Sequence, residues 1–195
     1  MHRAQRAQMR VLVGMQYNSL LKDLALPDET ANAVNDLLID AQVEAQQATM
    51  QDMMSGTSTA KEAKAKQDAI EARLRERLSK VLTTEELAQW DAYQGIADTV
   101  LYEALLDGQL TMLAPGLSEE TRATARVVLA EELAAELDRF YETDKQYTLD
   151  SFNQAQLEGL NNGMARVPDT VSEEQYAHLT SFIDLVAAAF QQMKK

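Results

Sequence analysis

Histidine and cysteine, the side chains that most often carry catalysis or bind metals near neutral pH, are almost absent from this sequence. The 195 residues include 2 His and no Cys, which excludes disulfides, thiolate catalysis and cysteine metal ligands. His178 follows Glu174 by four residues, so the two could share a metal ion or form an ordinary side-chain pair on one helix face. A dinuclear site in a helical bundle needs Glu-x-x-His motifs on two helices, and the sequence contains none. We therefore expect no metal site and no cofactor.

Paired carboxylates are the other groups that could do chemistry. Adjacent Glu pairs occur at 85–86, 119–120, 131–132 and 173–174. They fall in first turns or on polar faces of predicted helices, where the helix dipole and solvation account for them. Catalysis by paired carboxylates also needs a cleft, and nothing in the sequence indicates one. Glycine-rich phosphate loops and the Gly-x-Ser-x-Gly motif do not occur either, so we expect a protein that is not an enzyme.

Methionine and aromatic side chains remain as candidates for a binding surface. Met50, Met53 and Met54 lie close together at the predicted end of one helix. Methionine adapts to varied apolar partners, and it also fills hydrophobic cores. Trp90 is the single tryptophan, and Tyr93 follows it by one turn. We expect Trp90 to be buried, and an exposed Trp90 beside Tyr93 would instead mark a partner site. These five residues are the candidate partner-binding residues.

The elements that must position these side chains are helices. The chain has only 7 Gly and 3 Pro and is rich in Ala, Leu, Glu and Gln, which favours an all-α protein. The sixth predicted helix is the weakest, because four residues in its middle could end it early: Gly159, Asn161, Asn162 and Gly163. The fold class is an all-α bundle of about seven helices. Apolar residues recur at spacings of three and four over approximately residues 4–24, 28–54, 60–81, 84–113, 118–142, 149–166 and 172–193.

A helix-start signal recurs along the chain and indicates an internal repeat. Thr83 can cap the first turn of a helix while Glu86 reaches back to complete a capping box. Ser172 and Gln175 are expected to form a second complete box. Related starts lie 91 residues apart at Leu26 and Leu117, and 89 residues apart at Leu82 and Val171.

This spacing predicts a tandem duplication of a three-helix unit. Residues 1–81 form the first helical repeat, and residues 82–195 form the second, with a long linking helix at about 84–113. The alternative is that Ser/Thr-x-x-Glu boxes recur by chance, as they do in any all-helical protein.

Charge excludes one class of partner. The formal net charge of −13 repels the phosphate backbone, so we expect no binding to nucleic acid. Residues 1–27 and 60–81 each carry a net charge of +3, whereas residues 82–195 carry −13. These basic and acidic parts could pair within the molecule, or between two copies in a homodimer. They could also be ordinary solvated helix faces.

The sequence does not determine the cellular compartment. No run of about eighteen apolar residues occurs, so we expect no membrane span. The chain begins without the apolar region of a signal peptide, although a removed signal or an upstream membrane anchor would leave no trace. The first helix is amphipathic with basic first turns, so it could pack on its neighbours or lie on an anionic membrane surface. The absence of cysteine fits the cytoplasm and the periplasm equally.

The second helix-start signal carries a family resemblance. Val171-Ser172-Glu173-Glu174-Gln175, and less closely Leu82-Thr83-Thr84-Glu85-Glu86, resembles the Leu-Thr-x-x-Gln motif of Spy- and CpxP-type periplasmic helical proteins. The resemblance implies a small, all-α, cysteine-poor protein that forms a cradle-like antiparallel dimer. Such a protein holds unfolding clients without ATP or regulates envelope stress. Glu86 stands where glutamine is expected, and this chain is longer and acidic where a Spy-like cradle would be basic.

The sequence and the resemblance together predict a non-enzymatic helical interaction protein with a chaperone-like or adaptor role in the bacterial cell envelope. Its partner would be a protein or an unfolded client, and its apolar seams and methionines would bind it. The first role implies a periplasmic or membrane-associated location. The alternative is an acidic regulatory or scaffolding protein that docks one specific basic partner, and it would fit a cytoplasmic location.

Overall fold

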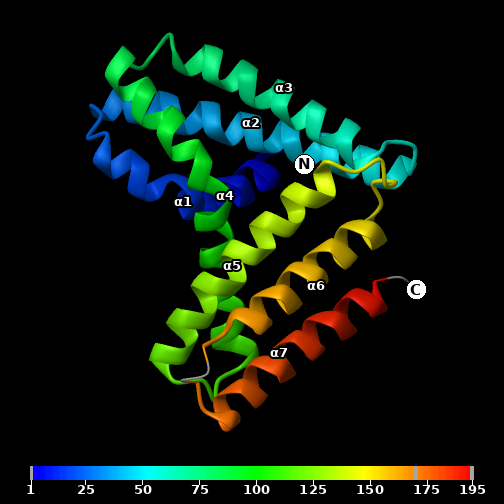
Figure 1. The fold of residues 1–195 in the computed structure, drawn as a ribbon. Helices are drawn as coiled ribbons and strands as arrows, with labels where there is room; N and C mark the ends of the chain where they lie inside the picture. The colour runs from blue at the N-terminus through cyan, green and yellow to red at the C-terminus, as the bar shows by residue number, and fades with distance from the viewer. Residues whose placement is uncertain (1, 169–170, 194–195) are drawn as a thin grey trace.

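The computed structural model describes residues 2–168 and 171–193. Over these ranges the predicted all-α class and the number of helices are confirmed, and the only extended pairing is an isolated bridge between two loops. The largest difference at a helix end is at the third helix, which ends at Leu78 rather than at Val81. The helices shown in Figure 1 are α1 (His2–Asp23), α2 (Asp28–Ser55), α3 (Ala60–Leu78), α4 (Thr84–Leu113), α5 (Glu119–Tyr141), α6 (Leu149–Arg166) and α7 (Glu173–Gln192).

Hydroxyl side chains fix the starts of several helices. Thr83 Oγ1 accepts a hydrogen bond from the N–H of Glu86 at 3.3 Å, and the Glu86 carboxylate accepts one from the N–H of Thr83 at 2.7 Å. The capping box predicted at the start of α4 is therefore confirmed. Thr59 and Glu62 form the same box at the start of α3. The loop before it begins at Gly56, whose φ of 59° is a left-handed conformation that glycine adopts without strain.

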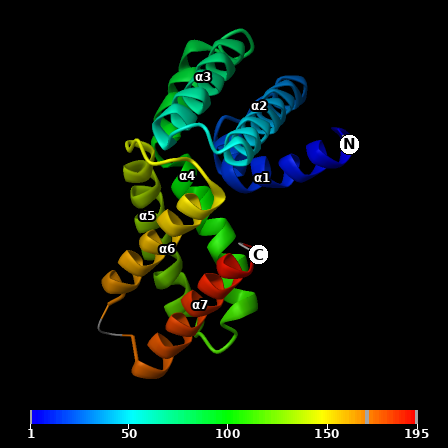
Figure 2. The ribbon, with the colours of Figure 1, turned by 90° about the vertical axis from the view of Figure 1, so that its right-hand side faces the viewer.

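The chain folds into two halves that share the long helix α4. Figures 1 and 2 show α1, α2 and α3 on one side and α5, α6 and α7 on the other, with α4 running through both. The first core contains buried side chains of α1, α2, α3 and the first half of α4, among them Met9, Val34, Leu78 and Trp90. The second core contains side chains of the second half of α4 and of α5, α6 and α7, among them Leu110, Leu129, Leu160 and Phe182.

A third cluster, the joining core, also connects the two halves, and Tyr102 of α4 packs against it. It brings the first turns of α3 against the end of α5 and the start of α6. Tyr147, in the loop between α5 and α6, is completely buried in it. Its buried members are Ala60, Ala63, Leu133, Leu137, Phe140, Tyr147 and Ala155.

The internal repeat stays a prediction. The similar intervals between corresponding helix starts are consistent with it. Buried Val34 and Leu38 of α2 correspond, after a shift of 91, to buried Ala125 and Leu129 of α5. The predicted boundary at residue 81 lies in the turn before α4, whereas the first core extends into α4 as far as Ala97. The residues that precede corresponding helices are Pro27 and Ser118 (91 apart), Thr59 and Thr148 (89 apart), and Thr83 and Ser172 (89 apart).

Helix α6 has the predicted bounds, and tertiary packing accounts for the glycines in its middle. The helix continues to Arg166. A Cβ atom on Gly159 would lie 2.8 Å from Leu133 Cα, and one on Gly163 would lie 3.0 Å from Leu129 Cα. The two glycines thus allow the backbones of α5 and α6 to approach closely, and this packing offsets their poor helix propensity.

The first helix packs within the fold through one of its faces. Met9, Val13 and Tyr17 of α1 are buried in the first core. Across the described ranges, none of the helices has both the length and the apolar character that a membrane crossing requires.

Candidate functional site

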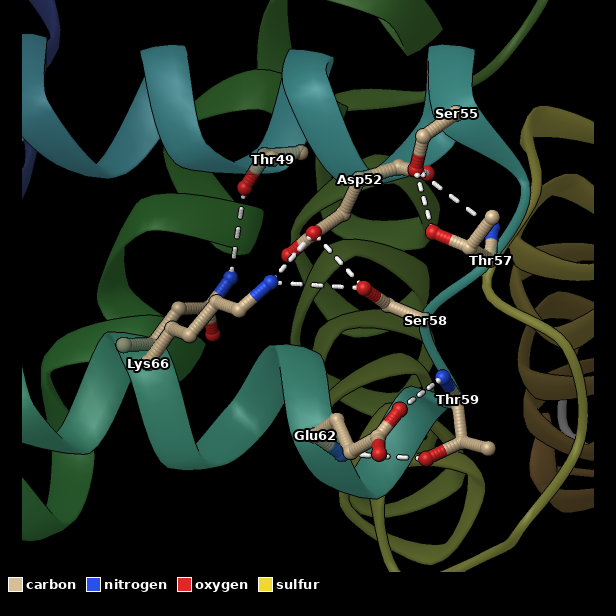
Figure 3. A network of polar contacts seen from close by, with 9 residues as sticks. Thr49, Asp52, Ser55, Thr57, Ser58, Thr59, Glu62 and Lys66 are labelled. Atoms are coloured by element: carbon tan, nitrogen blue, oxygen red, sulfur yellow. Dashed lines mark hydrogen bonds and ion pairs between the residues drawn. The ribbon is translucent and has the colours of Figure 1, made fainter.

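A polar network holds the loop between α2 and α3, and the buried carboxylate of Asp52 is its centre (Figure 3). Asp52 Oδ1 accepts hydrogen bonds from Ser58 Oγ, at 2.7 Å, and from Lys66 Nζ. Ser55 Oγ donates to the backbone carbonyl of Asp52 at 3.0 Å and contacts the Thr57 hydroxyl. Side chains from the end of α2, the loop and α3 therefore meet at one carboxylate.

The residue types in this network could serve nucleophilic catalysis, but their arrangement does not activate Ser58. Lys66 Nζ lies 3.3 Å from Ser58 Oγ, within reach of a general base. Burial raises the pKa of Asp52, but hydrogen bonds from Lys66 and Ser58 outweigh it and leave the pKa below its usual value. Lys66 is therefore engaged in an ion pair with the Asp52 carboxylate rather than placed to accept a proton from Ser58. The network stabilises the loop.

The loop that Asp52 holds pairs with the loop between α5 and α6. The N–H of Tyr147 donates to the carbonyl of Ser58 at 2.8 Å, and the N–H of Ala60 donates to the carbonyl of Lys145 at 2.8 Å. An antiparallel bridge joins Thr59 and Gln146 between these two bonds. The pairing lies beside the joining core and ties the two halves together.

The three predicted methionines do not form one patch. Met50 and Met54 are 54% and 83% exposed, whereas Met53 is partly buried and packs against the joining core. Met50 and Met54 are four residues apart and share one face of α2, which is exposed. Met53 lies on a different face, which is turned toward the fold. The exposed pair remains available to a partner.

Trp90 and Tyr93 belong to the fold rather than to a binding surface. Trp90 is 2% exposed in the first core, and its ring stacks on Tyr17 with centroids 5.0 Å apart. The Tyr93 hydroxyl donates to the backbone carbonyl of Gln16. The expectation that Trp90 is buried is confirmed, and Trp90 is therefore not accessible to a partner.

Gln175 forms a contact between helices in place of the predicted capping box. Ser172 Oγ accepts from the N–H of Gln175 at 3.3 Å, which is half of the box. The Gln175 side chain instead accepts from the N–H of Ser118 at 2.6 Å and donates to the carbonyl of Gly116 at 3.0 Å. It therefore fastens α7 to the turn between α4 and α5.

His178 packs on the same turn. A Cβ atom on Gly116 would lie 2.4 Å from its ring, so His178 covers the backbone of that glycine. Within the described ranges, no group of three or more His, Asp or Glu side chains could hold a metal ion.

The basic residues of the first half pair mostly with acids of the same half. Lys66 pairs with Asp52, and Arg73 pairs with Glu44. Arg75 pairs with the first part of α4, because both its Nε and its Nη2 donate to Asp91 at 2.7 Å. Most acids of the second half therefore receive no compensation from the basic helix α3.

Two carboxylates, one on α3 and one on α5, lie within electrostatic range of a third on α4. We call Glu71 of α3, Asp98 of α4 and Asp138 of α5 the acidic junction. Asp98 interacts electrostatically with Glu71, Asp138 and Lys64. Burial and then Asp138 raise the pKa of Asp98, and Lys64 opposes them.

Glu71 responds in the same way. Burial raises its pKa, Asp98 and Asp68 add to the rise, and Lys64 opposes it. Water reaches Asp98 and Glu71, yet protein surrounds them closely enough to penalise their charge. The junction is therefore a place where negative charge is concentrated and under-compensated.

Aromatic and amide side chains surround the junction. Gln16 Nε2 donates to Asp98 Oδ1 at 3.2 Å. The pKa values of Tyr17 and Tyr102 are raised, first by burial and then by Asp98. Asp98 is therefore close enough to both tyrosines for its charge to oppose their ionisation.

Little in the sequence marks the residues of the acidic junction. Glu71, Asp98 and Asp138 are far apart in the chain and look like ordinary polar positions. The burial of Asp52 could have been predicted from the sequence. Apolar residues recur along α2 at spacings of three and four up to Ala48, and Asp52 is the next position on the same face. A carboxylate on a buried face needs partners, and Lys66 and Ser58 supply them.

Comparisons with known proteins identify no relative. No family model matches the chain, and searches of curated proteins and of solved structures also find no match. The resemblance to Spy- and CpxP-type proteins therefore stays a prediction.

Proposed function

We propose that the protein is a non-enzymatic adaptor that binds a basic segment of a partner protein at the acidic junction. The observation that supports this most strongly is the convergence of Glu71, Asp98 and Asp138 from three helices. Among the groups of the described chain that act on Asp98, Lys64 is the one cation. A lysine or arginine of a partner would replace repulsion among these carboxylates with attraction, which favours binding and selects for basic partners.

Binding of a cation at this place has a measurable proton signature. The raised pKa values of Asp98 and Glu71 mean that the junction holds protons at a pH where ordinary carboxyls have lost them. A bound cation lowers these pKa values and releases protons. Affinity for a basic segment should therefore fall as the pH falls through the raised pKa values.

The test is calorimetric titration with a short synthetic peptide rich in lysine and arginine. We expect Asp98→Asn to weaken binding several-fold. Glu120→Gln at the exposed start of α5 changes the net charge by the same amount and should leave affinity nearly unchanged. Equal weakening by both substitutions, or none by either, would show that only diffuse charge attracts the peptide and would refute the proposal.

A chaperone-like role is the second candidate, and the exposure of Met50 and Met54 favours it. Flexible thioether side chains on a surface suit varied apolar clients. The expected result is that the protein suppresses aggregation of an unfolding client without ATP, and that replacing Met50 and Met54 by Ser weakens the suppression. The periplasmic or membrane-associated location rests on the family resemblance.

A further inference from the structure

The two terminal helices carry opposite charge. Within His2–Asp23, α1 has four Lys or Arg and one acid, whereas Glu173–Gln192 of α7 has three acids and no Lys or Arg. Arg10 and Lys22 of α1 are exposed, as are Glu173 and Asp184 of α7. Within the described chain, none of these four takes part in an ion pair.

The outer face of α1 is a narrow row whose first half is apolar. Val11 and Met15 are 57% and 41% exposed. Gly14 lies between them, and a Cβ atom there would have no neighbour within 4 Å. Asn18 continues the row one turn later with a short polar side chain, which is also exposed. This row lies opposite the residues that α1 buries in the first core, so nothing in the described chain covers it.

The outer face of α7 borders an apolar groove of about 640 Å³ between α7 and the end of α6. The hydroxyls of Thr180 and Ser181 donate to backbone carbonyls of their own helix, at 3.1 and 2.9 Å, so they offer no free donor to a ligand. Glu173 is the one acidic residue in the described lining. Val167, Pro168 and Val171 line the groove beside the end of α6, and Tyr176 and Ala177 line it from α7.

The spacing of charges on the two faces matches. Arg10 and Lys22 are twelve residues apart, and Glu173 and Asp184 are eleven residues apart, which correspond to about 18 and 16.5 Å along a helix. A single antiparallel register therefore brings Lys22 opposite Glu173. Arg10 lies one residue before Val11 and about 100° around the helix from it, so it reaches Asp184 from the edge of the contact. Antiparallel packing also aligns the helix dipoles favourably.

The same register brings exposed positions together along the whole contact. Two small residues, Gly14 and Ser181, face one another near its middle, which allows the helix axes to approach there. Met15 meets Thr180 at the groove. The opposing pairs, all of them exposed in the single chain, are Lys22 with Glu173, Asn18 with Ala177, Met15 with Thr180, Gly14 with Ser181, and Val11 with Asp184.

We infer that α1 of one copy packs antiparallel against α7 of a second copy, with Met15 in the groove beside Thr180. A closed twofold dimer contains this contact twice, because each copy offers both helices. The contact uses no residue of the acidic junction, so it stands or falls independently of the proposed adaptor function.

Thiol cross-linking tests the contact directly, because the chain contains no cysteine. Met15→Cys and Thr180→Cys variants are mixed and treated with a short bismaleimide. We expect linked dimers in the mixture and none with either variant alone. Met15→Cys mixed with Met112→Cys, whose position is 71% exposed and outside the groove, should give no linked dimer. Equal linking to both positions, or linking of a single variant to itself, would overturn the inference.

Charge exchange supplies a second test by analytical ultracentrifugation. Arg10→Glu with Lys22→Glu should convert the dimer to monomer, with an unchanged helical circular dichroism spectrum. Mixing that variant with one carrying Glu173→Lys and Asp184→Lys should restore association. A wild-type chain that is monomeric from micromolar to millimolar concentration would overturn the inference, even if a basic helical peptide from another protein binds the groove.

Discussion

Two helical glycines offer a test of how α5 and α6 pack. Gly159 of α6 and Gly95 of α4 both lie inside helices. A Cβ atom on Gly159 would lie 2.8 Å from Leu133 Cα and 3.2 Å from the Glu132 carbonyl oxygen, whereas one on Gly95 would meet nothing within 4 Å. Replacing glycine with alanine inside a helix stabilises it by roughly 0.5–1 kcal/mol. Gly95→Ala should gain this amount.

Gly159→Ala has the same propensity gain but must also move the α5 backbone. Overpacking of this kind costs about 1–3 kcal/mol, so the net effect should be a loss of roughly 1–2 kcal/mol. For a chain of this length, 1 kcal/mol shifts the melting temperature by about 2–4 °C. Gly159→Ala should therefore melt below wild type and Gly95→Ala above it.

Urea unfolding of both variants, followed by circular dichroism, gives the two free energies of unfolding. The quantity of interest is their difference, because the propensity gain cancels. Gly108→Ala, another open helical position, is a second control and should behave like Gly95→Ala. A Gly159→Ala variant as stable as these controls would show that α5 and α6 do not approach closely, and the reasoning would be wrong.

Three further predictions concern Trp90, Asp52 and Asp98. Trp90→Ala should lower the free energy of unfolding by roughly 3–5 kcal/mol, and wild-type fluorescence should be blue-shifted and poorly quenched; a maximum typical of water would contradict burial. Asp52→Ala should cost about 1–3 kcal/mol at pH 7. Because the pKa of Asp52 is lowered, that difference should shrink in urea titrations as the pH falls through the folded-state pKa. Asp98→Asn should raise the free energy of unfolding at pH 7. The raised pKa of Asp98 means that its ionised form destabilises the fold, and this penalty disappears once the carboxyl is protonated in the folded and unfolded states. The gain from Asp98→Asn should therefore vanish near about pH 3. A gain that stays constant with pH would refute this prediction.

Local signals predicted the helices well, because they depend on neighbouring residues. The box of Thr83 and Glu86 satisfies backbone donors within one turn, so it forms wherever the chain places it. The apolar spacing of α1 likewise identified Met9, Val13 and Tyr17 as one face, and all three are buried. The location of Trp90 in the core followed from the same periodicity.

Signals that depend on a distant partner were misread. Gln175 has the right type and spacing for a capping box, yet the turn at Gly116 and Ser118 offers its amide a better pair of contacts. Gly159 and Gly163 are helix breakers in isolation, and they become packing residues only because α5 lies against them. Met53 turned inward because the joining core lies beneath it.

The sequence by itself determined the helices, most of their ends and the faces that they bury, because periodicity and capping act over one or two turns. It also determined the excess of negative charge in the second half. Only the tertiary structure decided that Glu71, Asp98 and Asp138 share one place. Helix periodicity says which way a side chain points, but not which side chain of another helix it meets. Which side chains meet depends on how α3, α4 and α5 cross, and the packing of all three cores determines these crossings.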